Sequence, residues 1–351
     1  MKSLKRSKPS LLMNIVVFTK NWLGDVIFET PAIQAIKENF PNSHLIAVTH
    51  SRCRDILKSN PYVDEIIHFD NRKEQKSYFA KFRFIQNLRK RGIDLAFLFH
   101  RAQEHAWIAY LAGARKRVGY TTKWRSYLLT HPMPEPLEFV HDVQYFMDLV
   151  SFSGLNVKND YCYEFYFSKE EEQQAEKLLK EHGLTSNSIV AINPGANWFP
   201  KRWPSHYFKQ LAERLVKQCG VQIVVTGDES DRSVAEEIVA GNNSNLVSMC
   251  GKTSLGVLGA LFSKCRLVIS NDTGPLHIAA GSGVNVVALF GPTQPLETGP
   301  LGRGRNVMIQ CVPDGIDSLP WMGKKSPPPW MELMSVDQVY QIIKKEKLIA
   351  S

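Results

Sequence analysis

Short apolar runs rich in β-branched residues recur along the chain and alternate with longer stretches of helical character. The apolar runs lie at residues 14–19, 45–49, 66–69, 95–99, 189–193, 221–226, 267–270 and 284–290. The helical stretches lie at residues 26–39, 78–91, 168–182, 205–219, 231–240 and 336–348. Strands that alternate with helices at this spacing form βαβ units with parallel strands. The alternation therefore predicts an α/β protein with two doubly wound halves, joined between residues 155 and 170.

Length and composition agree with two folded domains. The chain has 351 residues, of which 44% are hydrophobic and 22% are charged, and a domain usually takes about 150 residues. No apolar run reaches the roughly 18 residues that a membrane span requires, so we expect a cytoplasmic protein. The six cysteines are scattered without a C-x-x-C pair, which argues against a zinc module or a disulfide framework.

Positive charge is concentrated in one part of the first half. Between Arg72 and Arg125 there are 14 lysines and arginines and three acidic residues, a net charge of +11 within a chain whose formal net charge is +9. The rest of the chain therefore sums to −2. Such a concentration suggests an anionic partner: nucleic acid, an acidic membrane surface or a phosphorylated substrate.

The sharpest local motif is Ser270-Asn-Asp-Thr-Gly-Pro275, which ends a strand and leads into the helix that carries His277. Asp272 or Thr273 suits the N-cap of that helix, and proline suits its first turn. The free N–H groups of a helix start bind anions such as phosphate. The alternative is an ordinary capped helix, and the local sequence does not separate the two interpretations.

Two further motifs also follow strands. The segment from Asn193 to Pro204 contains the adjacent cations Lys201 and Arg202, which a ligand phosphate could meet at the carboxyl end of a sheet. A proline-rich connection with solvated cations is about equally compatible. Leu23-Gly24-Asp25 follows the first strand and places a carboxylate where a general base could act. Taken alone, Asp25 reads more simply as a helix cap.

Several other chemistries lack their motifs. No G-x-G-x-x-G or G-x-x-x-x-G-K-[ST] follows a strand, which counts against a dinucleotide-binding dehydrogenase and a P-loop ATPase. No G-x-S-x-G elbow is present, which lowers the odds of a hydrolase of that type. No D-x-D pair is present either, so a metal-held diphosphate is not supported. A departing diphosphate would then be stabilised by cations and helix dipoles.

Taken together and in order, the motifs resemble glycosyltransferase family 9, the ADP-heptose:lipopolysaccharide heptosyltransferases, and more closely the heptosyltransferase II branch. The resemblance rests on four segments spread over nearly the whole chain. They are Asn14 to Pro41, Pro194-Gly-Ala with Lys201-Arg-Trp-Pro204, Asn271-Asp-Thr-Gly-Pro-Leu-His277, and Ala288-Leu-Phe-Gly-Pro-Thr293.

The resemblance implies a GT-B fold, with two Rossmann-like doubly wound domains facing across a cleft. Residues 1–165 would form the acceptor-binding domain, and residues 166–330 the nucleotide-sugar-binding domain. Residues 331–351 would form a last helix that crosses back to the first domain. The implied reaction is an inverting transfer that needs no metal ion.

The resemblance also implies roles for individual residues. Asp25 matches the general base and Lys201 the lysine at the donor phosphates. The residues expected at the donor are Gly195, Lys201, Glu229, Asp272, Thr273, Gly274 and His277. Glu229 would contact the nucleotide ribose, with Asp228 as a competing alignment. A base on one domain and cations on the other agree with the needs of a single displacement.

The basic segment falls in the domain that the resemblance assigns to the acceptor. The residues expected there are Gly24, Arg115, Arg117, Lys123 and Arg125. The implied partners are a nucleotide sugar and an anionic lipid-linked saccharide, met by a monomer at the cytoplasmic face of the inner membrane. Nucleic acid is disfavoured because the cations lie among sheet elements.

Two alternatives stay open. The chain could be a family 9 enzyme with another nucleotide sugar or glycan acceptor, or a binding protein that has lost catalysis. The presence of both Asp25 and Lys201 argues against the second.

Overall fold

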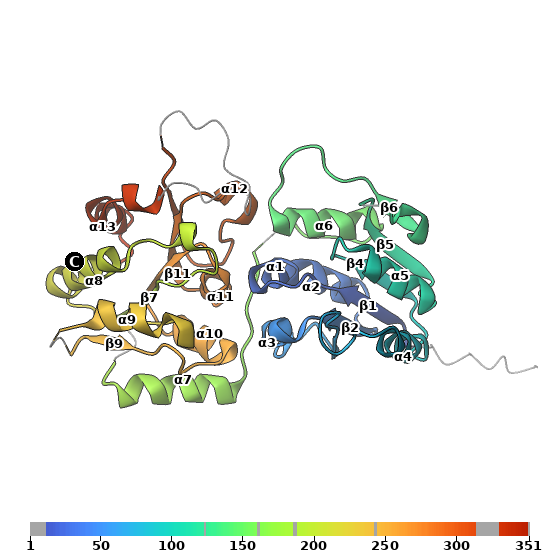
Figure 1. Cartoon of the computed structure of the whole chain (residues 1–351), viewed down its shortest axis with the longest axis horizontal. Coiled ribbons are helices and arrows are strands. Elements are labelled where there is room, and N and C mark those ends of the chain that lie inside the picture. Colours follow the sequence, from blue (N-terminus) through green and yellow to red (C-terminus); the bar gives the residue numbers. More distant parts are fainter. Residues whose placement is uncertain are drawn as a thin grey trace, which may run out of the picture.

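The computed structural model describes residues 12–122, 124–159, 162–184, 188–241, 244–313 and 330–349. It contains two six-stranded sheets that lie side by side, each with helices packed against it (Figure 1). Every pair of neighbouring strands in the two sheets is parallel. The prediction of a two-part α/β fold is therefore confirmed.

Both sheets have the same topology. The first has the order β3-β2-β1-β4-β5-β6 and the second the order β12-β11-β10-β7-β8-β9. Counted from the first strand of each half, both orders are 3-2-1-4-5-6, which is that of Rossmann folds. The strands are β1 (Asn14–Phe18), β2 (His44–Thr49), β3 (Glu65–His68), β4 (Leu95–Leu98), β5 (Lys116–Tyr120), β6 (His131–Met133), β7 (Ile189–Asn193), β8 (Gln222–Val225), β9 (Leu246–Ser248), β10 (Leu267–Asn271), β11 (Asn285–Phe290) and β12 (Asn306–Gln310).

The helices of the first half are α1 (Leu23–Phe28), α2 (Thr30–Asn39), α3 (Arg54–Leu57), α4 (Tyr78–Arg89), α5 (Gln103–Leu111) and α6 (Asp142–Phe152). Helices α1 and α2 take the place of the single helix that the sequence predicts over residues 26–39. The break falls at Glu29 because Pro31 has no N–H to continue the helix. The Thr30 hydroxyl donates to the carbonyl of Ile27 at 2.8 Å instead.

Helices of the second half begin and end at recognisable signals. They are α7 (Lys169–Glu181), α8 (Ser205–Cys219), α9 (Arg232–Val239), α10 (Leu255–Ser263), α11 (Gly274–Gly281), α12 (Pro295–Thr298) and α13 (Val336–Lys345). A capping box between Ser168 and Glu171 starts α7 and satisfies two free N–H groups. Helix α8 ends at Gly220, whose φ of +64° favours glycine.

The largest hydrophobic cluster runs through both halves. It joins buried residues of β1, α2 and α6 to buried residues of α7, α10 and α11. Helix α1 of the first half contacts α11 of the second, and Figure 1 shows α1 at the junction. The two halves therefore share one buried core where they meet.

Helix α13 stays with the second half. Val339 and Ile343 belong to the core cluster of that half, and Arg214 on α8 donates to Asp337 at 2.9 Å. The Arg214 guanidinium also lies 3.8 Å from the centre of the Tyr340 ring. The expected crossing of the last helix to the first domain is therefore wrong for the described residues, because its apolar face packs against α8.

Candidate active site

The two sheets bring their ligand-binding edges to a common seam. In sheets of this order, ligands bind beyond the carboxyl ends of strands 1 and 4, where the strand order reverses. Asp25 follows β1, Lys201 follows β7, and Asp272 follows β10. Because α1 and α11 are in contact, these residues gather at one place between the halves.

Asp25 lies in the first turn of α1, where the helix dipole favours a carboxylate. Its side chain is 26% exposed, and its Oδ2 lies 4.0 Å from Lys20 Nζ. Burial raises the pKa of Asp25 above its ordinary value, and Lys20 and Lys201 oppose that rise. The carboxylate thus lies in a partly dehydrated place, within the field of a lysine from the other half.

A buried acid fixes the loop beside Asp25. Glu29 at the end of α1 is fully buried, and its Oε1 accepts a hydrogen bond from the backbone N–H of Lys20 at 2.7 Å. Burial raises the pKa of Glu29 well above its ordinary value. The Lys20 ammonium in turn lies 3.5 Å from Asp142 Oδ2. Glu29 and Asp142 therefore position the cation that faces Asp25.

Lys201 is held in place by the motif at the end of β10. Its Nζ donates to Asp272 Oδ2 at 2.6 Å, and the Thr293 hydroxyl donates to the same oxygen at 2.8 Å. Asp272 is 4% exposed, whereas Lys201 retains 15% of its side-chain surface. Asp272 is therefore a buried anchor that presents the ammonium of Lys201.

The start of α11 lies beside this ion pair. Thr273 is the N-cap residue, but its side chain makes no capping hydrogen bond, and the first turn contains Pro275. A helix start without a side-chain cap leaves its N–H groups for an anion. Lys201 and this helix start together form a positive region that suits a phosphate.

Gly195 and Glu229 lie at the carboxyl ends of the neighbouring strands β7 and β8. A Cβ atom on Gly195 would meet Asp231 Oδ2 at 2.3 Å, so only glycine fits over that buried acid. Glu229 is 70% exposed and pairs with Arg232 at 2.7 Å. Asp228 instead caps the following turn by accepting from the N–H of Ser230 at 2.8 Å. Both acids are exposed; Asp228 is engaged in this cap, whereas Glu229 pairs with the neighbouring Arg232.

Close packing at the seam accounts for Gly24, Gly274 and His277. A Cβ on Gly24 would lie 3.0 Å from His277 Cδ2, and one on Gly274 would lie 3.0 Å from the Cβ of Leu23. The His277 ring packs edge-on against Phe28, with 4.6 Å between centroids. Its Nδ1 pairs with the Tyr163 hydroxyl at 3.0 Å.

This packing corrects the expectation that His277 contacts the donor. The side chain is buried between the halves and leaves no surface for a ligand in this arrangement. Burial lowers the pKa of His277 to about 4, so the ring is neutral at physiological pH. The His277 side chain of α11 therefore packs against α1.

Comparison with protein families identifies the family to which this chain belongs. A model of glycosyltransferase family 9 (heptosyltransferase) matches residues 81–315, more than half of the chain. The chain belongs to glycosyltransferase family 9. The matched range includes Lys201, Asp272 and Thr293, so the ion pair described above lies within the family region. The protein is accordingly a glycosyltransferase.

Curated relatives of this family 9 glycosyltransferase cover most of its length. It is 29% identical over 300 residues to lipooligosaccharide heptosyltransferase 2 of Haemophilus influenzae, covering 82% of this chain and 86% of the relative. It is 25% identical over 306 residues to lipopolysaccharide heptosyltransferase 2 of Escherichia coli K12, covering 84% and 88%.

Solved structures show the same fold. The glycosyltransferase family 9 protein of Veillonella parvula superposes with a TM-score of 0.84 at 24% identity, covering 97% of this chain and 99% of that one. The E. coli ADP-heptose lipopolysaccharide heptosyltransferase II superposes with a TM-score of 0.77 at 22% identity, covering 95% and 98%. The GT-B fold expected from the sequence is confirmed.

The cations expected at the acceptor of this glycosyltransferase lie elsewhere. Arg115 and Arg117 stand at the start of β5, the edge of the sheet opposite to Asp25. Arg115 is exposed and pairs with Asp94 at 3.2 Å, while the Nε of Arg117 donates to the carbonyl of Leu128 at 2.5 Å. These two predictions are corrected, because in a parallel sheet the amino end of β5 lies on the side opposite to the carboxyl end of β1, which Asp25 follows. Lys123 lies outside the described residues.

Arg125 is buried rather than offered to a ligand. Its side chain is 0% exposed, and it donates to the carbonyls of Tyr120 at 2.8 Å and His100 at 2.5 Å. Backbone carbonyls at the ends of β4 and β5 thus take up the guanidinium. The expectation that Arg125 contacts the acceptor is corrected, because the side chain holds these loops together.

Other cations do lie at the carboxyl edge of the first sheet. Arg101 follows β4, donates to the Tyr145 hydroxyl at 3.0 Å and is half exposed. A cavity of about 580 Å³ lies beyond β2 and β3. It is lined by His50, Ser51, Arg52, Asp70, Arg72 and Lys73. The signal that indicates these residues is position, because they follow strands that the sequence predicts. Arg115 and Arg117 instead stand before or at the start of β5, which the sequence pattern does not predict.

Two features are absent from the described residues. These residues contain no group of three or more His, Cys, Asp or Glu side chains arranged to hold a metal ion. Within the same ranges, no helix has the length and apolar character needed to cross a bilayer.

Proposed function

We propose that this enzyme transfers a heptose from ADP-heptose to a hydroxyl of the lipopolysaccharide inner core, with inversion and without a metal ion. The heptose and the core acceptor are suggested by the activities in the names of its relatives. The observation that carries the mechanism is geometric: α1, which bears Asp25, contacts α11 of the other half, and α11 begins beside the Lys201–Asp272 ion pair.

Asp25 acts as the general base. It accepts the proton of the acceptor hydroxyl as that oxygen bonds to the anomeric carbon of the donor. The bond from that carbon to the diphosphate oxygen breaks, and its electron pair leaves with the nucleotide. The raised pKa of Asp25 makes it a stronger base than an exposed aspartate.

Lys201 and the start of α11 stabilise the departing diphosphate. Asp272 and Thr293 hold the lysine by bonds of 2.6 and 2.8 Å to one carboxylate oxygen, so little reorganisation is needed when charge develops. The N–H groups after Thr273 add the helix dipole. Gly274 allows α11 to approach α1 at this point.

The remaining donor contacts come from the neighbouring strand ends. The exposed Glu229 carboxylate accepts hydrogen bonds from the ribose hydroxyls, and the backbone at Gly195 passes close to the nucleotide. Both lie at the carboxyl edge where Rossmann-like sheets bind nucleotides.

The acceptor lies against the first half, at the carboxyl edge that carries Arg101. The cavity lined by Arg52, Arg72 and Lys73, called the basic cavity below, lies at the same edge. The acceptor's phosphates and acidic sugars are met by these three side chains in place of Arg115 and Arg117. Bidentate arginine contacts suit such groups. The enzyme works as a monomer at the cytoplasmic face of the inner membrane, where its lipid-linked acceptor is held.

The test is ADP release from ADP-heptose in the presence of deep-rough lipopolysaccharide. Asp25→Asn should lower kcat by roughly 10²- to 10⁴-fold and leave the thermal shift caused by ADP unchanged. Asp337→Asn, which removes an exposed carboxylate on α13, is the matched control and should retain full activity.

Three results contradict parts of this proposal. Wild-type turnover by Asp25→Asn refutes the base. Turnover with another nucleotide sugar but none with ADP-heptose refutes the donor. Stabilisation by nucleotide sugars without turnover of any of them indicates a binding protein.

A further inference from the structure

Helix α4 exposes large aromatic side chains on the outside of the first half. Tyr78, Phe79 and Phe82 are 92%, 69% and 57% exposed. The opposite side of the helix packs through Phe84 and Leu88 against the first sheet. The three exposed rings are therefore additional to the core, and the fold does not need them for packing.

Cations share the exposed arc of α4 with these rings. At 100° per residue, Arg83, Arg89 and Lys90 fall on the same half of the helix as Tyr78, Phe79 and Phe82, and all six are exposed. The guanidinium of Arg83 lies 5.9 Å from the centre of the Phe79 ring. The helix contains no acidic residue. Its outer face is therefore both aromatic and uniformly positive.

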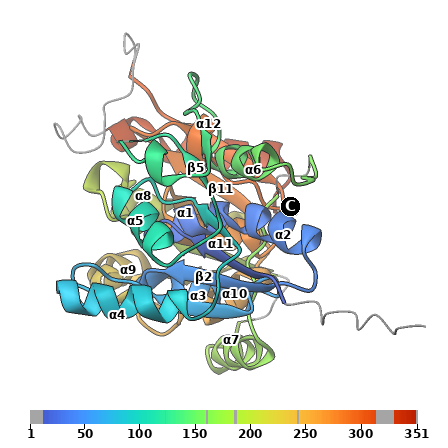
Figure 2. The same ribbon diagram turned by 90° about the vertical axis from the view of Figure 1, so that its right-hand side faces the viewer.

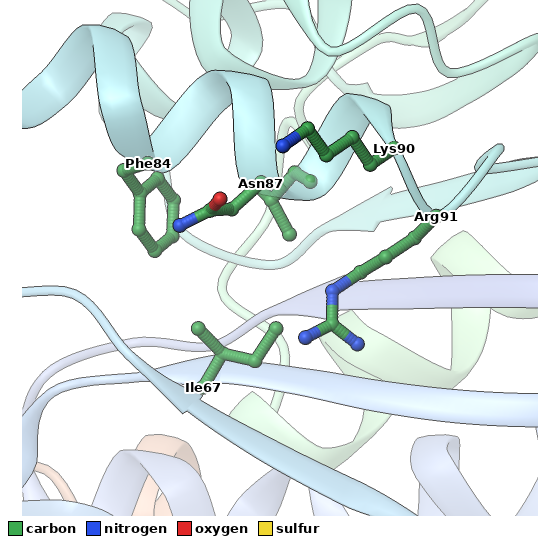
Figure 3. A pocket seen from close by; sticks show the side chains of 6 residues that line it. Ile67, Phe84, Asn87, Lys90 and Arg91 are labelled. Carbon is green, nitrogen blue, oxygen red and sulfur yellow. The ribbon is translucent and has the colours of Figure 1, made fainter.

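A cavity with the same mixed character lies at the edge of this arc. It has a volume of about 340 Å³ and lies between α4 and β3 (Figure 3). Ile67 and Phe84 form apolar walls, and Lys90 supplies a cation at the end of the helix. Arg91 also lines the cavity, with its guanidinium paired to Glu65. An apolar cavity with a positive rim suits a group that is part glyceride and part phosphate.

The exposed surface continues onto the neighbouring helix. Helix α5 packs beside α4, and its Trp107 ring contacts that of Tyr110, with 6.0 Å between centroids. Both are partly exposed. Figure 2 shows α4 and α5 on the side turned away from the second half, so the second half does not cover this surface.

We infer that α4 lies on an anionic phospholipid surface, with Tyr78, Phe79 and Phe82 among the headgroups and Arg83, Arg89 and Lys90 against lipid phosphates. Aromatic side chains are enriched at the interface between membrane and water, and lysines and arginines near the surface are attracted to anionic lipids. A second copy of the chain is disfavoured as the occupant, because two α4 helices would bring like charges together.

The inference adds a lipid-binding surface outside the catalytic seam. It rests on the proposed function only for the reason why a lipid surface is near the enzyme. Helix α4 begins after the turn that carries Arg72 and Lys73, which line the basic cavity. A protein lying on α4 would therefore hold that cavity close to the membrane in which the acceptor is anchored.

The experiment is sedimentation of the full chain with vesicles of phosphatidylcholine, with and without phosphatidylglycerol. The wild type should bind only the anionic vesicles and should dissociate as salt is raised. Tyr78→Ser/Phe79→Ser/Phe82→Ser and Arg83→Gln/Arg89→Gln/Lys90→Gln should each weaken binding by about tenfold or more. The matched controls, Lys169→Gln/Lys177→Gln/Lys180→Gln on α7 and Phe152→Ser/Leu333→Ser, should bind as the wild type does.

Each outcome supports or overturns the inference. Equal binding to neutral and anionic vesicles overturns it, as does unchanged binding by both α4 variants. A concentration-dependent dimer that the aromatic variant abolishes overturns it in favour of self-association. ADP release with acceptor dispersed in neutral detergent should be the same for the α4 variants and the wild type, which verifies their fold. Vesicle binding without any turnover by the wild type refutes the proposed function and leaves this inference standing.

Discussion

Replacing Gly24 by alanine tests how tightly the two halves are fitted at the seam. The new Cβ would lie 3.0 Å from His277 Cδ2 and 3.6 Å from its Nε2. The ring has little freedom to retreat, because Phe28 packs against it at 4.6 Å and Tyr163 bonds its Nδ1 at 3.0 Å. The strain must therefore be relieved by separating α1 from α11 by a few tenths of an ångström.

Two opposing contributions set the magnitude for Gly24→Ala. Overpacking a close contact costs about 1–3 kcal/mol, and alanine gains about 0.5–1 kcal/mol over glycine within a helix. The position is in the first turn of α1, so the gain is at the low end. The expected net loss of stability is about 0.5–2.5 kcal/mol, which lowers Tm by a few degrees at about 2–4 °C per kcal/mol.

The assay is a double-mutant cycle between Gly24→Ala and His277→Ala, followed by differential scanning fluorimetry and by ADP release. In the absence of the ring, the alanine at 24 should cost nothing or should stabilise, so the two changes should couple by about 1 kcal/mol. Gly24→Ala alone should reduce turnover more than ADP binding, because it moves Asp25 relative to Lys201. Strict additivity, or a stable Gly24→Ala enzyme with normal turnover, would refute this account of the seam.

Three further predictions concern individual side chains. Because burial raises the pKa of Asp25 and the base must be ionised, kcat/KM should fall as pH decreases through a pKa above that of an ordinary aspartate; Lys20→Met should move this acid limb to still higher pH. Arg125→Met should destabilise the fold by about 2–4 kcal/mol in denaturant titrations, since buried carbonyls lose their donor, whereas Arg115→Ala should change stability by less than about 0.5 kcal/mol. An acceptor KM that rises for Arg115→Ala would restore the original assignment. Glu229→Gln should weaken ADP binding by roughly tenfold in calorimetry, and an unchanged affinity would remove Glu229 from the donor site.

The alternation of strands with helices could be predicted from the sequence because each apolar run is local. Apolar runs mark eight of the strands, and Asp25, Lys201 and Asp272 lie in segments that follow three of these at their carboxyl ends. The sequence pattern does not predict β5, so it could not show that Arg115 and Arg117 come before or at the start of a strand. Counting charge over a long segment concealed that difference in position.

Other features depend on partners far along the chain. Arg125 is buried by carbonyls of Tyr120 and His100, and no property of the arginine itself indicates this. The His277 ring is buried by its contacts with Phe28 and Tyr163. These two residues come from the opposite half and from the segment between the halves. Burial of polar side chains by distant residues was thus the part that the sequence did not reveal.

The contact between α1 and α11 has a consequence for motion. Because it is buried and continuous with the largest core cluster, separating the halves there would expose apolar surface to water. Rotation of one half on the other keeps the contact and turns it into a pivot. Points near a pivot move least, so Asp25 and Lys201 would keep their spacing while the outer parts of the donor and acceptor surfaces open and close. Substrates could then enter and leave without Asp25 and Lys201 being brought together again at every turnover.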